Sequence, residues 1–219
     1  MSGRFDPGQA LTIDMLAHSF GVSHMPVREA LRRLTAEKAL EPAANGSLLV
    51  PVISRPRLDD LVQARLALET LATERAARFL TGTRLTALRA KMEAHEETTL
   101  EDGVEELLRR NQAFHFHLYE ASGSEVFVGL IEALWLRFGP YLRLLSQAIA
   151  PRLGDPDFNN GSQHHRAVVA GLEAGDPGAA KDGIAADIRA TYELLCPLVG
   201  EMAEAGAAAR DAAPRPVRA

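Results

Sequence analysis

Cysteine, aromatic residues and long apolar runs are all scarce in this chain. One of its 219 residues is a cysteine, Cys196, so an internal disulfide framework is excluded, and such usage is typical of the reducing cytoplasm. No apolar run is long enough to cross a bilayer, and the N-terminal residues lack the apolar core of a signal peptide. The sequence therefore predicts a cytoplasmic protein with no membrane partner.

An excess of positive charge is missing as well. The formal net charge is −5, which argues against a protein that coats nucleic acid in bulk. The apolar fraction of 47% and the charged fraction of 24% are ordinary for a globular chain that can bury a sizeable core. Half of the basic residues in positions 1–55 nevertheless lie on one predicted helix, which is compatible with sequence-specific DNA binding.

That helix is predicted from residues 22–34. Ser23 can cap the free amides of its first turn, and Pro26 falls where a missing N–H costs little. An earlier amphipathic helix, 13–20, ends at Gly21. The apolar positions of the second helix face inward at helical spacing: Val27, Ala30, Leu31 and Leu34. Two short helices joined by a turn, the second with outward arginines, are typical of a helix-turn-helix that reads the major groove.

A β-hairpin is predicted directly after this helix. Glu41-Pro42 stops the helix, Asn45-Gly46 is a tight-turn dipeptide, and 47–50 is β-prone. The hairpin makes residues 1–53 a winged helix-turn-helix domain with Gly46 at the tip of the wing. The prolines that follow predict a linker at 54–57.

The rest of the chain predicts an all-α antiparallel bundle of six helices over residues 58–205. Glycine, serine and proline separate the apolar helical stripes, and the fold class is therefore mainly α. The alanine-, proline- and arginine-rich residues 206–219 predict a disordered tail. A bundle of this kind usually holds a ligand site in its core.

Three helices of this bundle each direct a group that can bind a metal toward the core. Asn111 and His115 lie four residues apart on one helical face, and His165 shares a stripe with apolar residues. Asp187 lies within another apolar stripe, where a carboxylate is costly unless it is paired. Two imidazoles and a carboxylate are a common donor set for zinc, nickel or manganese.

Other interpretations of these residues remain open. The histidines can be hydrogen-bonded core residues, and Asp187 can pair with Arg137, Arg143 or Arg189. His18 and His95 have no evident partner and are expected to be solvated. A metal-dependent bundle enzyme is the alternative of a different class, although no histidine follows a glutamate by three residues, as a ferritin-like di-iron site requires.

The predicted second helix resembles a known family. Residues 22–34, with Pro-Val-Arg-Glu-Ala-Leu at 26–31, look like the recognition-helix signature of GntR-type transcription regulators. The resemblance implies that Arg28 and Arg32 reach base edges or phosphates and that Gly46 lets the wing approach the minor groove. The full set of DNA-binding residues that it implies is Ser23, His24, Pro26, Arg28, Arg32, Arg33 and Gly46.

The chain departs from that family in three places. His24 stands where the family usually has arginine, and Ala43-Ala44-Asn45 replaces a commonly basic wing, so phosphate contacts should weaken. The family also carries a helix before the segment that resembles residues 7–11, and six residues precede Pro7. The winged-helix domain is therefore expected to lack its first helix or to be truncated.

The second domain resembles the FCD domain of the FadR-type branch of these regulators. The resemblance rests on 111–115, 119–123 and 165–169 followed by Gly175-Asp176. In that family a divalent metal is held by Asp, His, His and His, and the matching residues here are Asn111, His115, His165 and Asp187. Asn111 replaces the aspartate and Asp187 replaces the last histidine, which keeps the formal charge of the donor set.

The resemblance also implies partners and a mechanism. The metal and nearby arginines would bind a small organic acid, with Arg65, Arg137 and Arg143 as candidates for its carboxylate. A homodimer formed through the helical domains would present two recognition helices to a pseudo-palindromic operator, and the effector would change its DNA affinity. Some relatives instead take a long acyl ligand without a metal, which is the second alternative.

Overall fold

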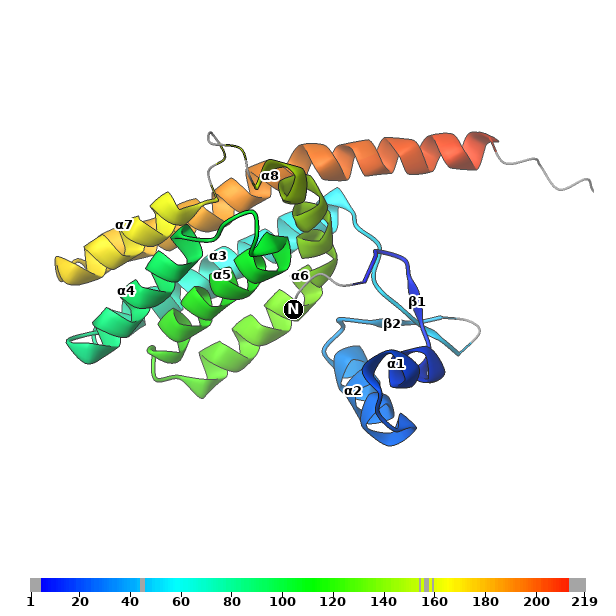
Figure 1. Cartoon of the computed structure of the whole chain (residues 1–219), viewed down its shortest axis with the longest axis horizontal. Helices are drawn as coiled ribbons and strands as arrows, with labels where there is room; N and C mark the ends of the chain where they lie inside the picture. The colour runs from blue at the N-terminus through cyan, green and yellow to red at the C-terminus, as the bar shows by residue number, and fades with distance from the viewer. Residues whose placement is uncertain (1–4, 44–45, 154, 156–157, 159, 213–219) are drawn as a thin grey trace, which may run out of the picture.

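The structure is a computed structural model that describes residues 5–43, 46–153, 155, 158 and 160–212, with side chains to residue 202. Two regions are distinct in Figure 1: a small N-terminal domain with short helices and strands, and a bundle of longer helices. The mainly helical fold agrees with the predicted class. None of the described helices is long and apolar enough to span a membrane.

The N-terminal domain is the predicted winged helix. Its helices are α1 (Ile13–Phe20) and α2 (His24–Ala36), and its strands are β1 (Ala10–Leu11), β2 (Glu41–Pro42) and β3 (Leu48–Leu49). Strands β2 and β3 form the expected antiparallel hairpin, and β1, which the sequence did not predict, adds to the other edge of β3. Residues 44 and 45, including the predicted turn residue Asn45, lie outside the described part of the chain.

Two details of α2 differ from prediction. Ser23 occupies the N-cap position, but its side chain makes no capping hydrogen bond. Ala30 is exposed, whereas Val27 and Leu31 are buried on the inner face of α2 and Leu34 is partly buried against the same core. By contrast, α1 has a side-chain cap, since Thr12 Oγ1 accepts from the Met15 amide at 3.2 Å.

In the described part of the chain, six α-helices form the second domain, as predicted. They are α3 (Arg55–Ala76), α4 (Thr83–Glu96), α5 (Gly103–Glu120), α6 (Glu125–Ile149), α7 (Ser162–Glu173) and α8 (Pro177–Ala212), with a 3₁₀ turn, η1 (Ala150–Arg152), after α6.

Two predicted boundaries are wrong. The segment 54–57 is not a linker, because Ser54 caps α3 by accepting from the Arg57 amide at 3.4 Å and Pro56 fits its first turn. Residues 206–212 are helical rather than disordered, since α8 continues to Ala212 through an alanine-rich segment of high helix propensity. Residues 213–219 lie outside the described part of the chain.

Helices α7 and α8 pack so closely that glycine is required between them. A Cβ added to Gly171 would lie 2.6 Å from the Ala180 nitrogen, and one added to Gly183 would lie 2.9 Å from the Val168 nitrogen. Real Cβ atoms essentially never approach other atoms that closely. The two glycines therefore permit α7 and α8 to lie close together (Figure 1). This approach brings His165 on α7 beside Asp187 on α8.

Candidate functional site

A hollow between α2 and the wing carries two arginines and a histidine of the first domain. His24, Arg28, Arg32 and Gly46 all line it. Arg28 is exposed and makes no ion pair with any described residue, whereas Arg32 binds Glu29 through contacts of 2.8 and 3.2 Å. Arg28 can therefore contact DNA directly. Arg32 must first break its ion pair with Glu29 before it can bind a phosphate or a base.

The remaining predicted DNA-binding residues lie elsewhere on α2. Ser23 and Pro26 are exposed at the start of the helix and do not line the hollow. Arg33 donates to Glu37 at 2.8 Å, and the backbone carbonyl of Glu37 accepts from Arg137 of α6 at 3.0 Å. Arg33 therefore lies on the side of α2 that faces the helical domain.

The helical domain encloses a cavity of about 370 Å³ between its helices. A volume of this size suits a small ligand. Part of its wall is apolar and includes Leu107, Leu142, Leu145 and Leu194. The charged and polar part of the wall contains Arg65, His95, Asn111, His115, His164 and Asp187.

His115 and Asp187 of the polar wall meet His165, as the sequence predicted. Nε2 of His115 lies 3.3 Å from Asp187 Oδ2 and 3.3 Å from Nε2 of His165, and the latter lies 3.6 Å from Asp187 Oδ1. All three residues are buried, so the sequence-based alternative of an arginine partner for Asp187 is not what the structure shows. The predicted fourth residue, Asn111, lines the same cavity one turn before His115.

Burial and mutual contact shift the pKa values of this cluster. Burial disfavours the charged form of Asp187, but the hydrogen bond with His115 and the attraction of the histidines and Arg65 outweigh it, so the pKa of Asp187 lies below its ordinary value. Burial also lowers the pKa of His165 well below its usual range. The cluster at neutral pH therefore holds a carboxylate and a neutral imidazole, the protonation states that a metal requires.

His115 begins a buried hydrogen-bonded chain that the sequence did not reveal. Its Nδ1 lies 3.0 Å from the Tyr119 hydroxyl, which donates to Glu69 Oε2 at 2.5 Å. Glu69 also accepts from Arg65 at 2.7 and 3.2 Å and from Trp135 Nε1 at 3.1 Å. Burial and the neighbouring Glu69 carboxylate raise the pKa of Tyr119, which keeps its proton on the hydroxyl.

A sequence signal for part of this chain exists. Arg65 and Glu69 lie four residues apart on an otherwise apolar face, as do His115 and Tyr119. The spacing indicates a shared face within one helix, but it does not indicate which helices bring Glu69 and Tyr119 together.

The expectation that His95 is solvated is wrong. Its side chain is 1% exposed, lines the cavity, and lies with its ring centroid 4.7 Å from that of His165. Burial lowers the pKa of His95 to about 4, so its imidazole is neutral. His18, the other histidine expected to be solvated, is exposed.

Of the three arginines predicted to bind an effector, the structure places one at the cavity. Arg65 lines it, with Nε and Nη2 bound to Glu69 and Nη1 outside that ion pair. Arg137 instead donates to the Glu37 carbonyl, and Arg143 Nε binds Asp6 Oδ1 at 2.7 Å. Both follow the side of α6 that contacts the winged helix, and their prediction as cavity residues is therefore corrected.

Comparison with known proteins supports the same division of the chain. Residues 1–50 match the gntR family of bacterial regulatory proteins, and residues 60–190 match the FCD domain. The HTH-type transcriptional regulator McbR of Escherichia coli (strain K12) is 31% identical over 80% of this chain and 77% of its own length. The gluconate operon transcriptional repressor of Bacillus subtilis (strain 168) is 23% identical over 80% of this chain and 72% of its own length.

The fold has a solved counterpart as well. The structure of E. coli McbR/YncC superimposes with a TM-score of 0.80 at 30% identity, covering 89% of this chain and 90% of that one. A winged helix joined to a helical domain, together with relatives named as regulators, defines a DNA-binding transcription regulator and decides against the enzyme alternative. The chain belongs to the GntR family and carries an FCD domain.

Proposed function

We propose that a divalent cation and a small organic acid bind in the cavity of the helical domain and thereby control the affinity of this regulator for operator DNA. The spacing of the donor atoms carries the proposal. Two ligands of a tetrahedral zinc ion, with bonds of about 2.0–2.1 Å, lie about 3.3 Å apart. The separations among His115, His165 and Asp187 are 3.3, 3.3 and 3.6 Å.

The residues fit a cation better than they fit a plain hydrogen-bonded core. The three donor groups all lie within 4.8 Å of one another and are buried, and Asn111 supplies a neutral oxygen from the same helical face as His115. Two Nε2 atoms that face each other at 3.3 Å are too far apart for a good hydrogen bond, and a bound cation would be shared by both lone pairs. Zinc, nickel and manganese are all compatible with this donor set.

An organic acid fits beside the cation because the cavity wall contains both polar and apolar side chains. A carboxylate can reach the cation and Nη1 of Arg65, whose guanidinium is held in place by Glu69 and lies over the rings of Trp135 and Phe138. Burial disfavours the Arg65 cation, but the attraction of Glu69 outweighs it and raises its pKa, so the positive charge persists. The leucines of the other wall would contact the carbon skeleton of the acid.

Helix α6 offers a route from the cavity to the winged helix. Trp135 and Phe138 on its inner face line the cavity, while Arg137 and Arg143 on its outer side contact the DNA-binding domain. A ligand that shifts α6 would bias the placement of α2, and by linkage DNA would then bias ligand binding. We expect two copies to act together as a homodimer on a pseudo-palindromic operator.

Titration with Zn²⁺ against a chromophoric chelator tests the cation site. Wild-type protein should bind one zinc ion per chain, and His115→Ala or His165→Ala should weaken binding by more than about 100-fold, since even an outer partner of a ligand is worth 10–100-fold. His18→Ala is the matched control, because His18 is exposed, and should bind like wild type. Equal zinc binding by all four proteins would overturn the site.

A further inference from the structure

The two imidazoles of the proposed cation site have unequal surroundings. His115 has a partner for each ring nitrogen, because Nε2 faces Asp187 and Nδ1 contacts the Tyr119 hydroxyl. That hydroxyl donates its own proton to Glu69, so its oxygen must accept the Nδ1 proton of His115. Nδ1 of His115 therefore carries a proton, and when a cation is bound the Nε2 lone pair is directed toward it, as is usual for a histidine that binds a metal.

His165 has no such partner. Its Nε2 faces His115 and Asp187, but its Nδ1 is buried without a hydrogen-bond partner among the described residues. One face of its ring stacks on the ring of Phe114, and the two ring centroids are 4.0 Å apart. Phe114 cannot accept a hydrogen bond from Nδ1, which points outward in the plane of the His165 ring. Buried polar nitrogens are almost always paired, so this one calls for an acceptor.

The polar ring next to His165 is that of His95, and its buried Nδ1 also lacks a hydrogen-bond partner among the described residues. In the described part of the chain three buried side-chain atoms lack a hydrogen-bond partner, and two of them are Nδ1 of His95 and Nδ1 of His165. The two ring centroids are 4.7 Å apart with the planes tilted by 48°. A hydrogen bond between the two rings would therefore give a partner to both Nδ1 atoms.

We propose that His95 is a positioning residue for the cation site: its Nδ1 accepts the Nδ1 proton of His165, directly after a small ring rotation or through one water molecule. The bond fixes the tautomer of His165 and directs its Nε2 lone pair toward the cation. This inference rests on the cation site proposed above. It gives His165 the outer partner that Tyr119 gives to His115.

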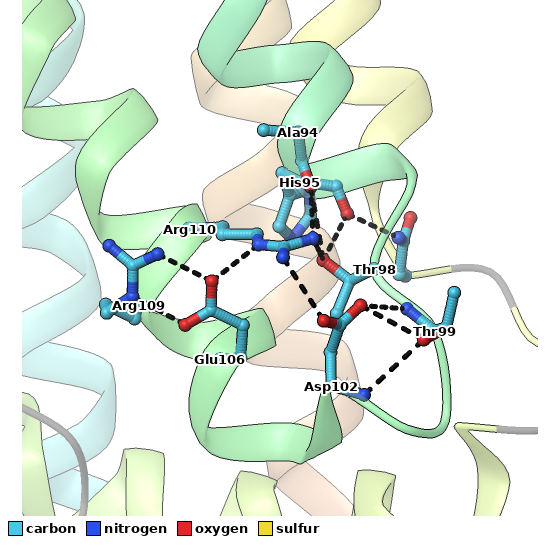
Figure 2. A network of polar contacts seen from close by, with 9 residues as sticks. Ala94, His95, Thr98, Thr99, Asp102, Glu106, Arg109 and Arg110 are labelled. Atoms are coloured by element: carbon cyan, nitrogen blue, oxygen red, sulfur yellow. Dashed lines mark hydrogen bonds and ion pairs between the residues drawn. The ribbon is translucent and has the colours of Figure 1, made fainter.

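The fold holds His95 firmly in place for this role, as Figure 2 shows. Arg110 of α5 binds the end of α4 by donating to the Ala94 carbonyl at 3.0 Å, while its other nitrogens contact Glu106 at 2.6 Å and Asp102 at 3.3 Å. Thr98 Oγ1 donates to the His95 carbonyl at 2.8 Å. These contacts fix the last turn of α4, which carries His95.

A separate contact ties that turn to the helix that carries His165. Asn160 Nδ2 donates to the His95 carbonyl at 3.2 Å, and Asn160 Oδ1 accepts from the Ser162 amide at 3.1 Å, at the first residue of α7. The two histidines are therefore held in register by one side chain. A neutral imidazole has one lone pair, so the ring of His95 can accept a hydrogen bond at Nδ1.

A direct bond from His95 to the cation is the competing role, and the geometry disfavours it. The donor atoms of His115, His165 and Asp187 all lie within 4.8 Å of one another, and His95 does not belong to that group. His95 instead contacts the ring of His165.

Two measurements on the full chain test the proposal. The first is Zn²⁺ affinity by chelator competition for wild type, His95→Phe, which removes the acceptor, and His95→Gln, which keeps one. We expect His95→Phe to weaken zinc binding by about 10–100-fold and His95→Gln to recover most of the loss. His18→Phe is the matched control at an exposed histidine and should leave affinity unchanged.

The second measurement is nitrogen-15 NMR of the imidazole rings, which a merely structural role for His95 would not affect. In zinc-free wild type His165 should carry its proton on Nδ1, and in His95→Phe the two tautomers should mix. This readout on wild type keeps the proposal testable even where a variant fails to fold.

The outcomes separate this inference from the cation site itself. Unchanged zinc affinity in His95→Phe, together with lost binding in His165→Ala, would overturn the role of His95 and leave the site intact. Absence of zinc binding by wild type would overturn the site proposal and with it this one. A zinc-bound chemical shift on a His95 nitrogen would overturn the positioning role in favour of direct coordination.

Discussion

The charged groups that the two domains can offer to a ligand lie in opposite places, at the surface in one and in the interior in the other. In the winged helix the ion pairs Arg32–Glu29, Arg33–Glu37 and His24–Asp14 lie at the surface around a small apolar core. In the helical domain Arg65, Glu69, His115, His165 and Asp187 are all buried. An exposed arginine can replace its carboxylate partner with a DNA phosphate. The buried groups are held in one arrangement and suit a ligand that fits between them.

The difference has an energetic consequence. Surface ion pairs contribute little to stability because water and salt screen them. A buried charge that loses its partner is costly, because it stays desolvated without compensation. The polar residues of the two domains should therefore respond very differently to mutation.

The largest effect is expected for the partner of the buried arginine. Glu69→Ala leaves Arg65 without its carboxylate and Tyr119 and Trp135 without their acceptor, which should cost about 3–5 kcal/mol and lower the melting temperature by about 10 °C. Glu29→Ala, which breaks the exposed pair with Arg32, should leave the midpoint nearly unchanged. Differential scanning calorimetry of both variants makes the comparison, and equal midpoints would remove the proposed distinction between the domains.

Acid should destabilise the zinc-free protein through its buried histidines. An unfolded histidine titrates near pH 6.5, whereas burial lowers the pKa of His95 to about 4, beside His115, Asp187 and Arg110. Between these values the unfolded chain binds more protons, so stability is complete above pH 6.5 and decreases toward pH 4 by up to about 3 kcal/mol for this residue. Urea unfolding with a chelator present should show this decrease, and His95→Phe should reduce it. A flat profile in wild type would mean that His95 is not buried as a neutral ring.

The DNA-binding face should depend most on Arg28, which makes no ion pair with any described residue. Arg28→Ala should weaken binding to an operator fragment by about 10–100-fold, as expected for the loss of one base or phosphate contact worth about 1–3 kcal/mol. Arg33→Ala removes a cation that faces the helical domain and should have a much smaller effect. Fluorescence anisotropy at fixed salt measures both. An Arg28→Ala protein that binds as tightly as wild type would remove Arg28 from the recognition face.

Replacing a helical glycine with alanine usually stabilises a protein, but the close packing of α7 against α8 should make it destabilising here. The expected effect is smaller than those above. Gly171→Ala gains about 1 kcal/mol in helix propensity, but its Cβ would lie 2.6 Å from a backbone nitrogen of α8, and such overpacking costs about 1–3 kcal/mol or more. A net loss of about 1 kcal/mol is expected by urea denaturation. Gly129→Ala on α6, where no atom lies within 4 Å, is the control and should stabilise slightly. A stabilised Gly171→Ala would show that α7 and α8 separate without cost.

The smallest effect concerns the contact between the domains. Arg137→Ala removes the hydrogen bond to the Glu37 carbonyl but no residue of the cavity or of the DNA hollow. It should leave zinc affinity and ligand-free DNA affinity nearly unchanged and reduce the response of DNA binding to ligand by about 2–5-fold, or about 0.5–1 kcal/mol. Anisotropy titrations with and without ligand measure this. An unaltered response would exclude this contact from the coupling route.

The sequence predicted what depends on local pattern. The recognition helix, the hairpin and the six helices follow from apolar periodicity and turn residues, and the meeting of His115, His165 and Asp187 follows from stripes that each had to face the core. The sequence predicts helix ends less well, because proline breaks the interior of a helix but is favourable in the first turn. Pro56 lies in the first turn of α3.

What the sequence could not predict depends on which helices become neighbours. Glu69 and Tyr119 are 50 residues apart and meet only because α3 packs beside α5. His95 lies in the last turn of α4, a position that is usually exposed, and is buried here where its ring packs against His165 of α7. Arg137 and Arg143 lie where they do because they contact the winged-helix domain. The sequence of a single helix does not indicate a contact between domains.

The central claim is that ligand in the buried cavity controls DNA binding at the exposed face. Its most direct test is the affinity for a DNA fragment from the upstream region of this protein's own gene, measured by anisotropy for chelator-treated and zinc-loaded protein, each with a panel of short carboxylic acids. Wild type should change its DNA affinity by about 5–150-fold between the empty and the fully loaded state, and the His115→Ala/His165→Ala double variant should not. Identical DNA affinity of wild type in every ligand state would contradict the account.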